Sequence, residues 1–224
     1  MNKKKQQIII NIFVICLYFL WPYTLSGIIN LFNLSEMSML YISFSINFIF
    51  LFVVIYIYKN RLKKYIKNLD NKFTKKLLCS LKIFFVCLVL FGFLNFLLRD
   101  ILKLPEPNTI NSMTVLFKKI PIFFVLNTLF YYPIIEELIF KMSFKDIFKN
   151  KWFFVIITGI FNALFQIVFS MNFVTDIVFI LPYAVFISGF SYIYYKTDNI
   201  IYPIFLRMCY NLIPCIIYMV DLLQ

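Results

Sequence analysis

The chain has 224 residues, of which 62% are hydrophobic and 21% are aromatic. A soluble domain of this length cannot bury so many apolar side chains, whereas lipid accepts them on every outward surface. The formal net charge of +12 argues little for nucleic acid, because the basic residues lie between apolar runs without interleaved aromatic residues. The composition predicts an all-α, polytopic transmembrane bundle that forms one integral membrane domain over residues 1–224.

Seven apolar runs are long enough to cross a membrane as helices. The count becomes eight if Pro182 breaks the sixth run, and the proline-containing stretch 99–113 is expected to be an external loop or an interfacial helix. The first run is too long for a signal peptide and is expected to be retained. The runs cover residues 8–32, 38–58, 77–98, 120–141, 152–170, 173–195 and 200–219.

Basic residues collect between particular runs. The stretch 59–76 carries eight Lys and Arg residues against a single acid, Asp70, and the connection 141–151 is basic as well. A cytoplasmic N-terminus places all the heavily basic segments on one side, as the positive-inside rule requires. We therefore expect 59–76 to be a basic cytoplasmic loop in contact with membrane lipid. Its charge is expected to act as a topology signal more than as a dedicated lipid-binding patch.

The fourth run carries two adjacent carboxylates, Glu136 and Glu137, after a long apolar stretch. Ionised carboxylates are costly to place in hydrocarbon, so the pair predicts a functional site. Glu137 and Lys141 share one helix face. Pro133 frees a backbone carbonyl that neighbouring groups must satisfy, which fits a polar pocket. In the alternative interpretation the acids mark the membrane–water interface and Lys141 snorkels to the headgroups.

Two later runs contain polar residues at helical spacing. Thr158, Asn162 and Gln166 form one stripe, which either bonds neighbouring helices or lines a pocket. Arg207 and Asn211 lie one turn apart in the last run. An intramembrane Arg keeps its charge and needs an acid, so Glu136 or Glu137 is its expected partner.

The residue types that are missing limit the chemistry. The chain has no histidine, which is the commonest acid–base group near neutral pH and the commonest metal ligand. Its five cysteines form no close CxxC pair, so neither a disulfide framework nor a structural zinc site is indicated. We expect no metal and no cofactor.

These segments resemble the CPBP intramembrane proteases, also called the CAAX prenyl protease or abortive-infection family. The family's first motif has two Glu, three residues and an Arg, and the segment 136–141 is similar, with Lys141 in place of Arg. The last motif follows a tyrosine-rich helix end and a turn with His, three residues and Asn. The segment 194–211 resembles it, with Arg207 at the His position and Asn211 at the Asn position.

The middle motif of the family has Phe, three residues and His. Alignment on Phe161 places Phe165 at the His position, whereas alignment on Thr158 places Gln166 there. The resemblance covers roughly residues 117–214, the expected protease-like core.

The resemblance implies that Glu136 activates water, that Glu137 and Lys141 support it, and that Asn211 is a polar pocket residue. However, Glu136, Glu137, Lys141 and Arg207 carry charges that cancel, and a guanidinium beside a carboxylate makes that carboxylate a poorer proton acceptor. The first hypothesis is therefore a pseudoprotease that binds or scaffolds a membrane protein or peptide. The resemblance implies roles such as bacteriocin self-immunity or cell-envelope regulation.

Two alternatives remain at the level of sequence. In the first, the protein is an active intramembrane endopeptidase that cleaves membrane or prenylated peptides, with Arg207, Gln166 and Asn211 in place of the histidines. In the second, it is a small transporter or channel, although the chain has no inverted repeat and few polar residues in the middle of its apolar runs. Its richness in Lys, Asn, Ile and Phe is typical of AT-rich bacterial genomes and predicts a multi-pass protein of a bacterial cytoplasmic membrane.

Overall fold

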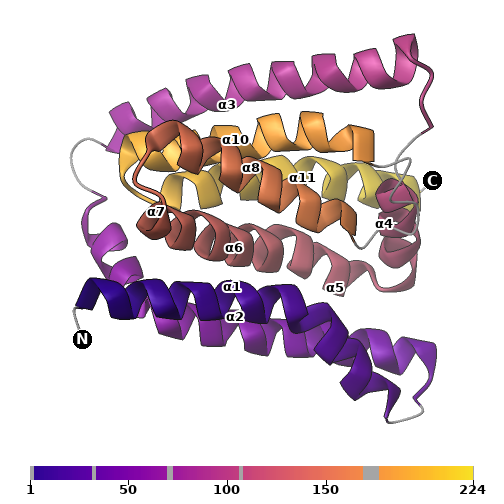
Figure 1. Cartoon of the computed structure of the whole chain (residues 1–224). Helices are drawn as coiled ribbons and strands as arrows, with labels where there is room; N and C mark the ends of the chain where they lie inside the picture. The colour runs from indigo at the N-terminus through magenta and orange to yellow at the C-terminus, as the bar shows by residue number, and fades with distance from the viewer. Residues whose placement is uncertain (1–2, 32–33, 70–72, 106–107, 169–176, 224) are drawn as a thin grey trace.

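The computed structural model describes residues 3–31, 34–69, 73–105, 108–168 and 177–223, and these residues are helical almost throughout (Figure 1). Within these described ranges, six helical segments are long and apolar enough to cross a membrane. The prediction of an all-α, polytopic membrane bundle is therefore confirmed. In chain order the elements are α1 (Lys3–Asn30), α2 (Glu36–Lys67), α3 (Phe73–Phe96), η1 (Leu97–Ile101), α4 (Asn108–Lys119), α5 (Pro121–Leu126), η2 (Asn127–Tyr131), α6 (Tyr132–Glu136), η3 (Glu137–Met142), α7 (Ser143–Ile147), α8 (Lys151–Val168), η4 (Ile177–Phe179), α10 (Ile180–Thr197) and α11 (Ile201–Leu223).

The fifth predicted span corresponds to α8, which is shorter than the six candidate spans. Its apolar part, Lys151–Gln166, reaches roughly 24 Å at 1.5 Å per residue, against about 30 Å of hydrocarbon. It still runs along most of the bundle, and the N-terminus and C-terminus lie at opposite ends of the bundle (Figure 1). Pro182 lies in the first turn of α10, where its missing N–H breaks no helical bond, so it does not divide this span into two.

Helix ends differ from the ends of the apolar runs. The helix α2 continues to Lys67, beyond the apolar run that ends at Tyr58, and α3 begins at Phe73. The stretch 59–76, expected as a loop, is thus mostly helical. Lys and Arg are good helix formers, so a cluster of charge marks where a helix leaves the membrane and not where it stops. The α4 helix lies where an external loop or an interfacial helix was expected.

The middle of the bundle is one uneven helix over Pro121–Ile147, made of α5, η2, α6, η3 and α7. Its most apolar window is 50% buried, whereas that of the outer span Phe73–Ile101 is only 11% buried. The central helix changes twice from α to π turns. π-turns are rare, and they are frequent at functional sites.

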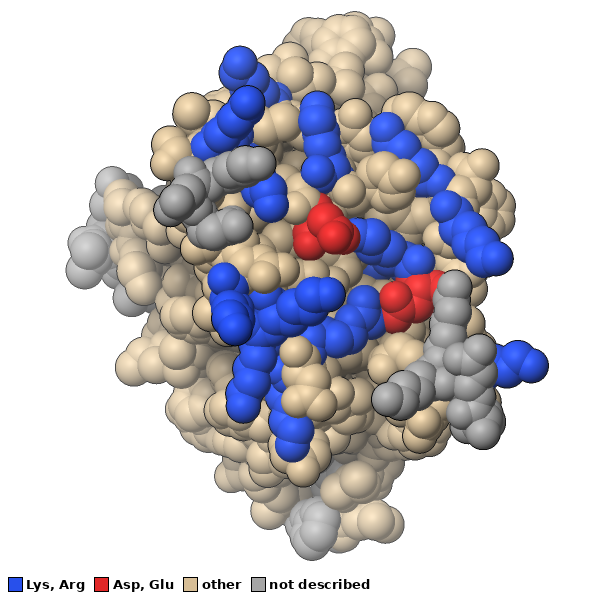
Figure 2. Space-filling model, turned by 90° about the vertical axis from the view of Figure 1, so that its left-hand side faces the viewer, with Lys and Arg blue, Asp and Glu red and all other residues tan. Residues whose placement is uncertain are grey.

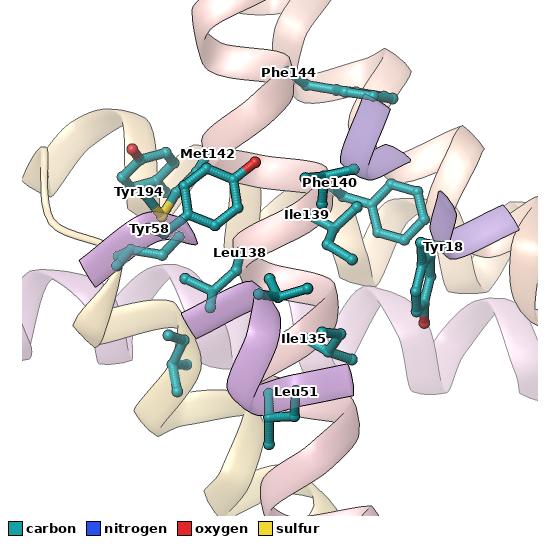
Figure 3. Packing of buried hydrophobic residues seen from close by; sticks show 14 of the residues in the cluster. Tyr18, Leu51, Tyr58, Ile135, Leu138, Ile139, Phe140, Met142, Phe144 and Tyr194 are labelled. Carbon is teal, nitrogen blue, oxygen red and sulfur yellow. The ribbon is translucent and has the colours of Figure 1, made fainter. Parts of the chain in front are cut away.

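The main hydrophobic cluster surrounds this central helix. Leu138, Ile139 and Phe140 are fully buried, with Tyr18 of α1 to one side and Tyr58 of α2 to the other (Figure 3). Side chains of α8, α10 and α11 complete the cluster. The helical turn that carries Glu136 and Glu137 is therefore fixed by apolar packing from several helices.

One end of the bundle is strongly basic. Figure 2 shows Lys and Arg side chains over most of this end, which carries the N-terminus, the end of α2 and the starts of α3 and α8. Asp146 pairs here with Arg61, and Asp198 pairs with Lys145. The segments that the positive-inside rule places on one side of the membrane thus lie at one end of the molecule, as the proposed cytoplasmic end requires.

The close contact between α8 and α10 gives a stability prediction. A Cβ atom on Gly159 would lie 2.6 Å from the backbone oxygen of Ala184 and 2.0 Å from Ser188 Oγ. Because the Ala184 oxygen belongs to the backbone, it cannot rotate away. We expect Gly159→Ala to lower the free energy of unfolding by about 1–3 kcal/mol.

The matched control is Gly92→Ala in α3, where an added Cβ would meet nothing within 4 Å. This change should be neutral or stabilising, because Ala favours helix more than Gly. Thermal unfolding in detergent measures both variants. Equal effects of the two substitutions would contradict the proposed role of the α8–α10 contact.

Candidate functional site

Two acids and two bases meet inside the bundle. Arg207 of α11 donates from Nη2 to Glu136 Oε2 and from Nη1 to Glu137 Oε1, the second contact at 3.2 Å. The ammonium of Lys141 donates to the same oxygen of Glu137. The side chains of Glu137 and Lys141 are 0% exposed, and those of Glu136 and Arg207 are 5% and 8% exposed. We call these four residues the charge cluster.

The local backbone explains how one Arg reaches both acids. Glu136 ends α6 and Glu137 begins η3, so their side chains leave the helix in different directions. The planar guanidinium of Arg207 presents several N–H groups in a fixed fork, and it can therefore bridge two carboxylates where a lysine would offer one point charge. The charges of the cluster cancel, which is what buried ions require.

Lys141 does not behave as a snorkelling residue. The membrane-spanning segment continues to Ile147, beyond the expected end at Lys141. The ammonium group remains inside, with Glu137 as its ion partner and the ring of Phe190 5.7 Å away. This geometry favours the predicted buried site over a marker of the membrane–water interface.

The polar stripe of α8 faces the charge cluster at one end. Gln166 Nε2 lies 3.5 Å from Glu136 Oε2 and 3.4 Å from Asn162 Oδ1. Thr158 is buried and donates to the carbonyl of Phe154 in its own helix. Within the stripe, Gln166 therefore contacts Glu136, Asn162 contacts Gln166, and Thr158 bonds within α8.

Phe165 has different surroundings from its neighbour Gln166. Its ring stacks on Tyr18 with centroids 4.5 Å apart and meets the ring of Phe19 at 5.1 Å. Its ring centroid lies 6.0 Å from that of Phe140. Of the two candidates for the second-motif position, the structure thus places Gln166 beside Glu136 and Phe165 in an aromatic cluster.

Asn211 contacts the central helix, at a backbone atom and not at an acid. Its Nδ2 donates to the carbonyl of Thr128 at 2.8 Å. In the π-turn η2 the N–H of Tyr132 bonds to the carbonyl of Asn127, and the next residue, Pro133, has no N–H to offer Thr128. The carbonyl that the proline was expected to free is thus satisfied from α11.

The N-terminal helices contribute residues to the site that the motifs did not predict. Tyr18 is 3% exposed and packs edge-on against Phe140 at 5.7 Å. Asn11 accepts a bond from Tyr58 and donates to Asp146, which joins α1 and α2 to α7. Asn11 lies within an apolar run, and this position could have predicted that its side chain has a polar partner. An isolated Tyr such as Tyr18 does not predict a contact in the same way.

The arrangement has a limited capacity for metal binding. Among the residues that the structure describes, no group of three or more His, Cys, Asp or Glu could hold a metal ion. Both Glu136 and Glu137 already bind cationic side chains. The charge cluster and Gln166 together carry no net charge, and their contacts connect the central helix to α8 and α11.

Comparison with protein-family models gives one finding. Residues 118–213 match the family described as type II CAAX prenyl endopeptidase Rce1-like, close to the range 117–214 expected from the motifs. Neither the curated proteins nor the solved structures gave a match. The matched segment includes the charge cluster, Gln166 and Asn211, whereas α1, α2 and α3 lie outside it. This multi-pass membrane protein therefore contains, over residues 118–213, a segment that matches the Rce1-like family of CAAX prenyl endopeptidases.

Proposed function

We propose that the protein is a pseudoprotease of a bacterial cytoplasmic membrane, which binds or scaffolds a membrane protein or peptide and does not cleave it. The observation that carries this proposal is the contact of Arg207 with both Glu136 and Glu137. A general base needs a carboxylate that is free to take a proton from water. An oxyanion stabiliser must lie where negative charge develops. Here the cation is instead bound to the two acids.

Access to the acids supports the same proposal. The side chain of Glu136 is 5% exposed, and its contacts are with Arg207 and Gln166 inside the bundle. A substrate helix would have to displace neighbouring side chains before its peptide bond could approach this buried carboxylate. A partner that binds without cleavage can instead use the exposed apolar sides of the outer helices. Bacteriocin self-immunity and cell-envelope regulation are roles of this kind.

Cleavage assays test the proposal directly. The purified full chain in liposomes should leave both membrane-spanning peptides and prenylated peptides intact, as should Glu136→Gln. The double variant Gln166→His with Arg207→His frees Glu136 from the guanidinium and places an imidazole beside it. We expect this variant to gain measurable peptidase activity, read as product peptides by mass spectrometry.

The matched control is Phe165→His with Arg207→His. Because Phe165 faces Tyr18 and not Glu136, this control should gain no activity. Partner binding is followed by photo-crosslinking in bacterial membranes, where Glu136→Gln should capture the same membrane protein as the parent. A parent that cleaves a membrane peptide at least tenfold faster than Glu136→Gln would replace the proposal by that of an active glutamate-dependent endopeptidase.

A further inference from the structure

A second candidate site, lined by three lysines, lies at the basic end, away from the charge cluster. A cavity of about 300 Å³ is lined by Lys75, Lys76 and Cys79 of α3 and by Lys196 and Thr197 of α10. We call it the lysine pocket. Its two helices pack side by side, so residues more than a hundred positions apart in the chain converge there.

The lysine pocket carries uncompensated positive charge. The acids that pair at this end are Asp146, bound to Arg61, and Asp198, bound to Lys145. Among the described residues, no carboxylate forms an ion pair with Lys75, Lys76 or Lys196. Lys75 and Lys76 also lie in the first turns of α3, where the helix dipole adds partial positive charge. Three lysines that line one cavity can turn their ammonium groups toward a phosphate group bound there.

The position of the lysine pocket decides between a lipid phosphate and a free phosphate ion. After Lys76, α3 exposes apolar side chains such as Leu78, Phe85 and Val86 along the outer side of the bundle, with the single exposed lysine Lys82 on the same face. Acyl chains can pack along this apolar track while their headgroup reaches the lysines. A free phosphate ion would make no favourable contact with these apolar side chains. We propose that the lysine pocket binds the phosphate headgroup of an anionic phospholipid, independently of the function proposed for the charge cluster.

Native mass spectrometry of the full chain in detergent tests the proposal with phosphatidylglycerol and phosphatidylcholine. The parent should form a one-to-one complex with phosphatidylglycerol and bind phosphatidylcholine much more weakly. The triple variant K75Q/K76Q/K196Q should lose about a hundredfold in affinity for phosphatidylglycerol, because each of the three lysines near an anionic headgroup contributes about fivefold. The charge-retaining variant K75R/K76R/K196R should bind as the parent does.

The matched control is K63Q/K64Q/K149Q, which removes three exposed lysines from the same end but outside the lysine pocket. It should stay within about twofold of the parent. If the glutamine triple variant does not fold, Lys196→Gln alone should still lose about fivefold. Equal losses in the control, or equal binding of both lipids by the parent, would overturn the proposal. Displacement of phosphatidylglycerol by an equal concentration of inorganic phosphate would assign the pocket to the free ion and overturn the lipid assignment.

Discussion

Arg207→Gln is expected to lower the midpoint of thermal unfolding in detergent by about 6–12 °C. The substitution leaves Glu136 buried with only the amide of Gln166 near it, at 3.5 Å. Breaking one partner of a buried ion pair costs about 3 kcal/mol or more, and each kcal/mol is worth about 2–4 °C in a chain of this size. Glu137 suffers less, because Lys141 still pairs with it.

The geometry specifies which second substitution restores stability. Glu136→Gln in the Arg207→Gln background removes the unpaired acid and leaves the neutral pair Glu137–Lys141, so most of the lost stability should return. Glu137→Gln in the same background leaves Glu136 and Lys141 each without its partner, and stability should fall further. If the two double variants are equally stable, the contacts assigned to Arg207 are not those that hold the bundle together.

Lys141→Met, which removes the second cation of the charge cluster, should destabilise the protein about as much as Arg207→Gln. The ammonium of Lys141 is fully buried and binds Glu137 Oε1. The other oxygen of Glu137, Oε2, is buried without a hydrogen-bond partner among the described residues, so Arg207 would be the remaining support of this carboxylate. We expect a loss of about 3–5 kcal/mol in the free energy of unfolding. Glu137→Gln with Lys141→Met should recover most of it, because the pair Glu136–Arg207 stays neutral.

Lys145, one turn after Lys141, provides the control for Lys141→Met. Its ammonium pairs with Asp198, whose side chain is 84% exposed. Lys145 itself is 23% exposed and its ammonium lies 4.2 Å from the centre of the Tyr194 ring, so Lys145→Met should cost about 1 kcal/mol, well below the loss expected for Lys141→Met. Chemical or thermal unfolding of both variants in the same detergent gives the comparison. A large effect at Lys145 together with a small effect at Lys141 would mean that burial does not govern these pairs.

The sequence predicted the fold class and the partners within the charge cluster because both follow from local rules. Hydrophobic runs of membrane length give helices, and the cost of an isolated buried charge requires Arg207 to find an acid. The extent of the helices was less predictable. Charge marks the limit of the membrane but does not end a helix, so α2 continues to Lys67.

The choice between Phe165 and Gln166 could not be made from sequence. Adjacent residues on a helix point about 100° apart, so the answer depends on how α8 is rotated about its axis. This rotation is set by packing against α10 at Gly159 and Ser188, a long-range contact that motif spacing does not encode. The contact of Tyr18 with Phe140 and Phe165 is long-range in the same sense, since it joins α1 to helices more than a hundred residues later.

Asn211 shows that a residue at a family-motif position can serve the backbone and not the chemistry. Its amide satisfies the Thr128 carbonyl that a π-turn followed by Pro133 leaves open. A chain that no longer hydrolyses peptides would still lose stability if it lost this asparagine. An asparagine at this position, together with the same proline, is therefore a poor indicator of catalytic activity. The residue that contacts the two acids is the informative one, and in this chain it is an arginine.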